Sequence, residues 1–126
     1  MPEKKVLVPG PDHPITVEPT KARVVVKAGG RVIADSRNAL TLQEASYPAV
    51  QYIPRADTDF SVLERTAHET YCPYKGEASY YSLVDGDVKA ENAIWTYEAP
   101  YEPVSPIKDH VAFYPNVVDS IELIED

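Results

Sequence analysis

Residues that could do chemistry gather in the stretch 70–81, which runs Thr-Tyr-Cys-Pro-Tyr-Lys-Gly-Glu-Ala-Ser-Tyr-Tyr. It holds the only cysteine of the 126-residue chain, Cys72. A thiol becomes a nucleophile when a neighbouring base or cation lowers its pKa, and His68 and Lys75 are the nearest candidates in the sequence. Lys75 could also form a Schiff base if it were desolvated. For Cys72 we favour a packed side chain beside the turn fixed by Pro73, because cysteine is among the most often buried residue types.

A second chemistry is ligand binding in a cleft with aromatic walls and a few polar groups, the usual form of a small-molecule site. Tyr80 and Tyr81 are expected to point to opposite faces of one strand, so that one joins the core and the other lines a surface or a cleft. Arg55 could clamp a carboxylate or phosphate, and Lys75 could donate to an anion. The predicted ligand-binding residues are Arg55, Tyr71, Cys72, Tyr74, Lys75, Ser79, Tyr81, Glu91 and Trp95.

Structural roles are the alternative for each of these residues. Arg55 could form an ion pair with Asp57 or Asp59, and Lys75 could be a solvated surface lysine. Many of the tyrosines suit half-buried strand positions, where their hydroxyl groups find partners. Glu91 could bond to the backbone at a strand end.

No metal site and no cofactor is predicted. Structural zinc sites are commonly built from paired Cys-x-x-Cys motifs, which a chain with one cysteine cannot form. A mixed site of Cys72, His68, His110 and a carboxylate would require distant residues to converge. The Asp-x-Asp spacings at 57–59 and 85–87 predict turns instead.

Charge and composition limit the partners and the compartment. The net charge is −8 without a basic stripe, which argues against a nucleic-acid or anionic-membrane partner. No apolar run approaches the roughly 20 residues that span a bilayer, and the N-terminus does not read as a secretory signal. One cysteine cannot form an internal disulfide. We therefore expect a soluble, cytoplasmic protein that is a monomer or a homodimer.

The elements that must position these residues are mostly strands. Residues 1–21 are predicted to form a proline-rich arm that is extended or disordered, and residues 22–126 are predicted to form a single domain. Segment 60–66 predicts a strand or a single helical turn, and 99–109 a loop with one helical turn near 104–107. The remaining predicted strands are 23–27 and 31–35 as a hairpin, 39–43, 49–53, 78–84, 88–97, 111–114 and 117–123. No segment has a helical apolar period, so the prediction is a mainly β, two-sheet domain with at most short helices.

Two parts of the chain resemble each other. Residues 30–36 match 86–92 in the pattern Gly, any, Val, any, Ala, acidic, small polar, and 50–54 match 111–115. We interpret this as two similar β halves, about 22–66 and 78–123, although chance similarity between short strands is the alternative. If the halves are real, stretch 70–81 joins them, and a ligand would lie where they meet.

Several of these strings together resemble a known family. They are Arg23-Val24 with Ala34-Asp35-Ser36, Tyr52-Ile53-Pro54-Arg55 with Asp57, the stretch 70–81, Glu91-Asn92-Ala93 with Trp95 and Tyr97, and Val111-Ala112-Phe113-Tyr114-Pro115. Over about 22–123 the chain is similar to the domain of unknown function 427. The resemblance implies a compact, mostly β domain, β-tent-like or a small barrel or sandwich. The family has carried a nucleotidyltransferase-like label, but this sequence lacks a glycine-rich phosphate loop and supported metal carboxylates.

Three functional hypotheses remain. The leading one is the binding of a small ligand, anionic or sugar-like, in an aromatic cleft around Tyr71–Lys75. The first alternative is a non-catalytic module for protein interaction or homodimerisation. The second is a thiol-based enzyme that uses Cys72. Whether the protein is an enzyme is left open.

Overall fold

The computed structural model describes residues 5–125, and these form ten strands with four short 3-10 helices. The strands are β1 (Ile15–Pro19), β2 (Arg23–Ala28), β3 (Arg31–Ser36), β4 (Leu40–Glu44), β5 (Val50–Pro54), β6 (Leu63–Cys72), β7 (Gly76–Asp85), β8 (Val88–Thr96), β9 (His110–Phe113) and β10 (Ser120–Ile124). The helices are η1 (Arg55–Asp57), η2 (Phe60–Val62), η3 (Glu102–Ile107) and η4 (Pro115–Val117). The prediction of a mainly β fold with only short helices is confirmed.

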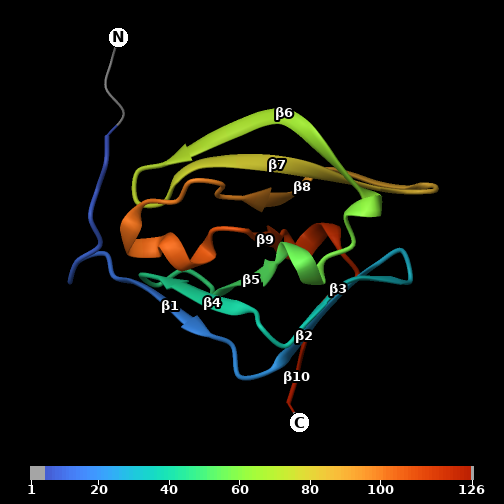
Figure 1. Cartoon of the computed structure of the whole chain (residues 1–126), viewed down its shortest axis with the longest axis horizontal. Coiled ribbons are helices and arrows are strands. Elements are labelled where there is room, and N and C mark those ends of the chain that lie inside the picture. Colours follow the sequence, from blue (N-terminus) through green and yellow to red (C-terminus); the bar gives the residue numbers. More distant parts are fainter. Residues whose placement is uncertain (1–4, 126) are drawn as a thin grey trace.

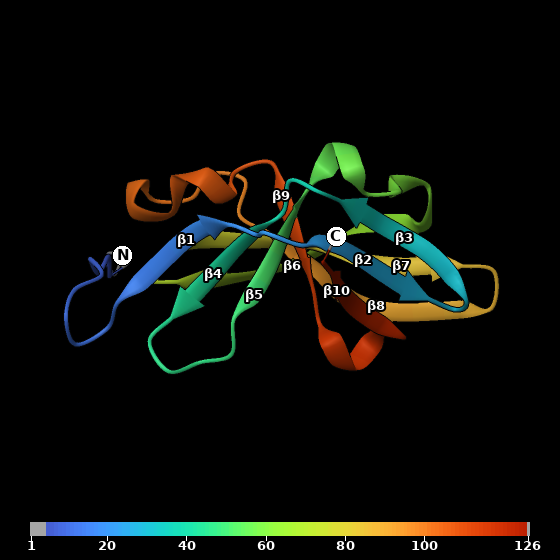
Figure 2. The ribbon, with the colours of Figure 1, turned by 90° about the horizontal axis from the view of Figure 1, so that it is seen from below.

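The strands form two antiparallel sheets (Figure 1). Seven strands make the larger sheet in the order β1-β4-β5-β9-β8-β7-β6, and three make the smaller one in the order β10-β2-β3. Neither sheet closes into a barrel, so the two-sheet prediction is confirmed in its open form. In the view of Figure 2, η1, η2 and η3 lie at the top of the molecule, and the β4–β5 loop and η4 lie at the bottom.

Local sequence explains the first hairpin. Three consecutive valines after Arg23 favour extended backbone because their branched side chains pack well on a pleated surface. Gly29 and Gly30 then take positive φ angles of 60° and 77°, which a tight hairpin turn requires and a side chain disfavours. Strands β2 and β3 pair across this turn as the sequence predicted.

Other elements differ from the expectation. Segment 60–66 combines both alternatives, because η2 leads directly into β6, and Asp59 caps η2 by accepting a 3.0 Å hydrogen bond from the Ser61 amide. Strand β6 then continues to Cys72, so stretch 70–81 is the β6–β7 hairpin. The predicted arm contains β1, which pairs with β4 at one edge of the larger sheet.

Two apolar clusters lie on opposite faces of the larger sheet. The first cluster joins β2 and β3 to β7, β8 and β9 and includes Tyr81, and it fixes the smaller sheet to the larger one. The second includes Tyr80 together with Val104 and Ile107 of η3. The prediction that Tyr80 and Tyr81 face opposite sides is confirmed, although both are nearly buried, at 6% and 7% exposure. Each fully buried aliphatic side chain in such clusters contributes roughly 1.5–3 kcal/mol.

The two pairs of segments that match in the sequence are arranged differently in the sheets. The matching hairpins, β2–β3 and β7–β8, lie in different sheets. The matching strands, β5 and β9, are direct antiparallel neighbours, with Ile53 opposite Val111 and Pro54 opposite His110. The origin of the two halves as a repeat stays a prediction.

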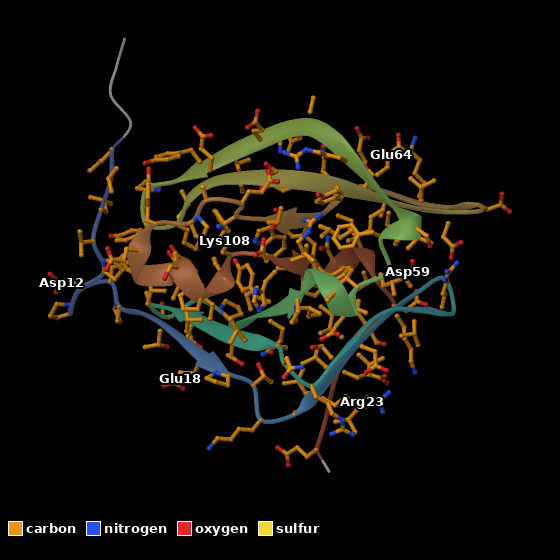
Figure 3. The ribbon with its side chains drawn as sticks, in the orientation of Figure 1. Asp12, Glu18, Arg23, Asp59, Glu64 and Lys108 are labelled. Carbon is orange, nitrogen blue, oxygen red and sulfur yellow. The ribbon has the colours of Figure 1, made fainter. Side chains whose placement is uncertain are left out.

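Charged side chains lie around the outside of the fold. Asp12, Glu18, Arg23 and Glu64 all project away from the ribbon (Figure 3). Among the residues that the structure describes, no helix is long and apolar enough to span a membrane.

Candidate functional site

A pocket of about 220 Å³ opens beside the end of β4, the β6–β7 turn and β8. We call it the tyrosine pocket, because five tyrosines contribute to its wall. Its aromatic and charged lining residues are Tyr47, Tyr52, Tyr80, Tyr97, Tyr114, Trp95, Lys75 and Glu44. Tyr47 is 60% exposed and stands at the mouth, whereas Tyr52 and Tyr97 are almost buried. The pocket therefore combines aromatic walls with an ion pair.

Three segments of the chain bring together a chain of polar groups beside this pocket. The Lys75 Nζ atom lies 2.5 Å from Glu44 Oε1, and His13 Nε2 lies 2.8 Å from Glu44 Oε2. The side chains of Lys75 and Glu44 are only 12% and 16% exposed. The ring of Tyr74 stacks on the His13 ring, with centroids 4.1 Å apart and planes within 8°. This packing holds the imidazole against the carboxylate.

The environment of Glu44 sets its charge. Burial alone would raise the pKa of the Glu44 carboxyl, but hydrogen bonds from Lys75 and His13 and their charges outweigh burial. The pKa therefore lies below its ordinary value of 4.5, and the carboxylate is ionised at neutral pH.

The position of Lys75 is fixed through its backbone. Its amide donates to the Cys72 carbonyl at 3.2 Å, which closes the β6–β7 turn, and its carbonyl accepts from the Tyr101 amide at 3.0 Å. Gly76 follows at φ +110°, where a Cβ atom would sit 3.4 Å from the Ala99 carbonyl oxygen. Glycine at this position allows the turn to approach segment 99–101.

Two buried tyrosines supply donors to the pocket. Desolvation by burial raises the pKa of both Tyr52 and Tyr97, so both phenols stay protonated at neutral pH. Tyr52 accepts a 3.1 Å hydrogen bond from Trp95 Nε1, which leaves its own proton to donate. Within residues 5–125 no hydrogen bond to the Tyr97 hydroxyl is formed, and no buried side-chain oxygen of these residues lacks a partner, so the Tyr97 oxygen is accessible in the pocket that the side chain lines. The Lys75 ammonium lies 5.9 Å from the centre of the Tyr97 ring.

The structure brings four of the nine predicted ligand-binding residues to this place. Lys75 and Trp95 line the tyrosine pocket, Tyr74 supports its polar chain, and Cys72 is partly buried against the same apolar cluster. His68, the proposed base for Cys72, packs on the Tyr80 ring instead, with centroids 4.6 Å apart.

Tyr71 lies beside the pocket but faces a different depression. Its hydroxyl bonds to that of Tyr101 at 2.9 Å and donates to the Lys5 carbonyl at 2.7 Å. The hydrogen bond with Tyr101 is the main cause that raises the pKa of Tyr71 to about 12. Tyr71 therefore connects the N-terminal segment to the loop before η3.

The other predicted residues gather elsewhere. Arg55 donates to the Tyr81 hydroxyl at 3.2 Å and lies over the Phe60 ring at 4.4 Å. Ser79 lies between Arg65 and Glu98, and Glu91 is exposed on β8. The predicted site is thus divided between the two faces of the larger sheet.

The alternative for Arg55, an ion pair with a nearby aspartate, is not seen among the described residues. Asp57 accepts from the Ser36 hydroxyl, and Asp59 pairs with Arg31 at 2.7 Å. Arg55 has a packing role against two aromatic rings instead.

Sequence reasoning missed His13, Glu44, Tyr52 and Tyr97 as pocket residues. Glu44 directly follows a predicted strand, which is a weak signal for a site at a strand end. His13 carried no signal, because it lies in the proline-rich segment. Within residues 5–125 no group of three or more His, Cys, Asp or Glu side chains is arranged to hold a metal ion.

Comparison with known proteins places the chain in a family. A search of curated proteins finds no match. Residues 16–123, nearly the whole chain, match the family described as Domain of unknown function (DUF427). This agrees with the resemblance carried by stretch 70–81 and its companion strings, and the chain belongs to the DUF427 family.

Proposed function

We propose that this protein binds a small organic anion in the tyrosine pocket, with aromatic rings around its body and its anionic group against Lys75. The ligand carries a carboxylate or a similar acceptor group. Binding, with no chemical step, is the activity that the pocket supports.

The arrangement of donors supports this proposal. The Lys75 ammonium has three N–H groups, of which Glu44 Oε1 takes one. The protonated hydroxyls of Tyr52 and Tyr97 add two further donors in the same lining. A lining rich in donors selects a ligand that accepts hydrogen bonds, because each unmatched polar group in a dry pocket weakens binding.

The single observation that carries the proposal is the Tyr97 hydroxyl. A hydroxyl that is accessible from a pocket and has no protein partner is free to bond to a ligand or a water. Within residues 5–125 the Tyr97 hydroxyl has no hydrogen-bond partner, and Tyr97 lines the pocket together with Lys75, whose ammonium lies 5.9 Å from the centre of the Tyr97 ring. A ligand oxygen between Lys75 and Tyr97 would satisfy both.

Glu44 limits the affinity of this site. It neutralises the charge of Lys75 and would repel a bound anion, so the ligand must compete with a carboxylate that is already in place. The Glu44→Gln substitution removes that repulsion and should therefore strengthen anion binding by about a hundredfold, as expected for one charge removed about 6 Å away in a medium of effective dielectric near 20.

The test is calorimetric titration of the wild-type protein and matched variants with small aromatic and aliphatic carboxylates. Lys75→Met should weaken binding by about tenfold or more, and Glu44→Gln should strengthen it. The double variant Lys75→Met with Glu44→Gln removes both charges together and serves as the folded reference without the ammonium. Arg55→Met, on the other face of the sheet, is the matched control for losing a cation. Equal carboxylate affinity in Glu44→Gln and in the double variant would contradict the proposal, as would tighter binding of organic cations than of carboxylates.

Self-association is a second candidate function, favoured by one observation. Strand β10 is an edge of the smaller sheet, and its last residues Leu123 and Ile124 are 51% and 40% exposed. An exposed apolar edge strand is a template for pairing with another chain. Light scattering after gel filtration tests it: a dimer in the wild type that Leu123→Lys dissociates supports self-association, and a monomer at all concentrations contradicts it.

A further inference from the structure

A second cavity adjoins the tyrosine pocket. It has a volume of about 400 Å³ and lies between β5, β9 and β10, with Ile53, Phe113 and Ile121 in its lining. We call it the apolar groove. Val50 and Trp95 line both the groove and the tyrosine pocket, so the two cavities meet at these residues.

The groove exists because the larger sheet separates at this point. Strands β5 and β9 pair only at Ile53 with Val111 and at Pro54 with His110. Continued pairing in the same register would place Val50 opposite Tyr114, but β9 ends at Phe113 and η4 follows. The β4–β5 loop and η4 diverge from this point (Figure 2). An opening in a sheet between two strands gives access from one face to the other.

The lining of the groove is suited to hydrocarbon. Gln51 is the polar side chain of its lining, and that amide is already engaged. Its Oε1 atom accepts from the Thr20 hydroxyl at 2.7 Å, and its Nε2 atom donates to the Thr41 hydroxyl at 3.1 Å. An occupant of the groove therefore needs no hydrogen-bonding group, and cavities with apolar walls take up apolar molecules in preference to water.

The geometry points to one continuous site for an amphiphilic acid, with its carboxylate in the tyrosine pocket and its aliphatic chain in the apolar groove. The aliphatic chain of the ligand passes Trp95 and Val50 and lies between the two sheets. This inference rests on the proposed function, which places the carboxylate of the ligand, and adds that the ligand carries an aliphatic chain. A cavity of 400 Å³ has room for on the order of ten groups the size of a water molecule or a methylene, each about 30 Å³.

The continuity of the cavities is the reason to assign a small amphiphile and not a second protein. Groove and pocket share two lining residues, and the donors lie at one end of the combined space, beside Lys75 and Tyr97. A ligand with one polar end and one apolar end matches this asymmetry.

The test is a titration of the full chain with straight-chain carboxylates from acetate to decanoate, below their micelle concentrations. Trp95 is the only tryptophan of the chain and lies where the cavities meet, so its fluorescence reports occupancy. Each added methylene should tighten binding by about threefold to fourfold until the groove is full, at on the order of ten carbons.

Two variants complete the test. Ala49→Phe, at an exposed loop position in the groove lining, should abolish the gain with chain length and leave the affinity for short carboxylates unchanged. Val32→Phe, at a 45% exposed position on β3 outside the groove lining, is the matched control and should behave as the wild type.

The possible results separate the two proposals. Carboxylates that bind with an affinity independent of chain length overturn this inference and leave the proposed function standing. If Lys75→Met binds the carboxylates as tightly as the wild type and with the same dependence on chain length, the assigned position of the head group is wrong, and the proposed function is wrong with it. A dimer that forms without ligand and that Ala49→Phe dissociates shows that a second copy covers the groove, which also overturns this inference.

Discussion

Lys75 and Glu44, 31 residues apart, form an ion pair 2.5 Å long in the lining of a pocket walled by tyrosines. The pair joins the β6–β7 turn to the end of β4. Strands β4 and β7 lie far apart in the order of the larger sheet. With less than a fifth of either side chain exposed, the pair is costly to break by removal of one partner.

The first prediction concerns the stability of the protein in acid. Because the pKa of Glu44 is lower in the folded state than its ordinary 4.5, its ionised form stabilises the fold. This contribution is complete above the unfolded pKa and is lost as the pH falls through the folded one. The free energy of unfolding of Glu44→Gln should therefore fall less steeply below about pH 4.5 than that of the wild type. Urea denaturation at a series of pH values measures this, and identical slopes would show that Glu44 does not contribute.

At neutral pH, Glu44→Gln should also destabilise the fold. Its amide cannot balance the largely buried ammonium of Lys75, and breaking a buried pair by neutralising one partner costs about 3 kcal/mol. The double variant with Lys75→Met should recover part of this loss, since no unpaired charge remains. A double-mutant cycle from urea denaturation measures the coupling, and additive losses would contradict a close pair.

The second prediction separates two tyrosines by their hydroxyl groups. Tyr97→Phe removes a hydroxyl for which no partner is seen within residues 5–125, so stability should change by less than about 0.5 kcal/mol. Carboxylate affinity should nevertheless fall about tenfold, the value of one hydrogen bond to a charged group. Tyr52→Phe should instead destabilise the fold by about 1 kcal/mol, because it leaves the Trp95 indole N–H without its acceptor. A stability loss in Tyr97→Phe as large as that in Tyr52→Phe would show that its hydroxyl has a structural partner.

The third prediction concerns the turn that carries Lys75. Gly76→Ala places a side chain at φ +110°, a region that costs other residues about 1–3 kcal/mol. It should lower the free energy of unfolding by that amount and weaken ligand binding as the turn shifts. Gly10→Ala is the control, because a Cβ atom there meets nothing within 4 Å, and its effect should stay within about 0.5 kcal/mol. Equal stabilities of the two variants would refute the strain argument.

The fourth prediction concerns Arg55, which the sequence placed in the ligand site. Its guanidinium contacts the Phe60 ring and the Tyr81 hydroxyl on the other face of the sheet. Arg55→Met should cost about 1 kcal/mol of stability through these contacts and leave carboxylate affinity unchanged. Thermal denaturation checks the loss of stability, and calorimetric titration checks the carboxylate affinity. A loss of affinity in Arg55→Met would show that Arg55 belongs to the ligand site.

The sequence predicted the elements that depend on local signals. The valine run with Gly29-Gly30, and Asp85-Gly86 between apolar strands, produced the hairpins β2–β3 and β7–β8 as expected. Strand β1 was missed because it is held by pairing with β4, a contact that the sequence of a proline-rich segment does not encode. The second half of β6 was missed because it is a mostly exposed edge strand, so polar residues such as His68 and Glu69 interrupt any alternation.

The lining of the tyrosine pocket was anticipated in part for the same reason. Lys75 and Trp95 were found because they belong to unusual local strings, and both line the tyrosine pocket. His13 and Glu44 reach Lys75 only through the β1–β4 pairing and the chain before it, which are non-local. Arg55 and Tyr81 were grouped with Lys75 by residue type, but the alternation of side chains along β7 places Tyr81 on the opposite face.

The most direct test of the central claim is the affinity of one carboxylate, octanoate, for the wild type and for Glu44→Gln, followed by Trp95 fluorescence at neutral pH. We predict that Glu44→Gln binds octanoate about a hundredfold more tightly, because the substitution removes the repulsion of the Glu44 carboxylate and frees the Lys75 ammonium for the ligand. Binding that is equal or weaker in Glu44→Gln would contradict the placement of an anion beside Lys75.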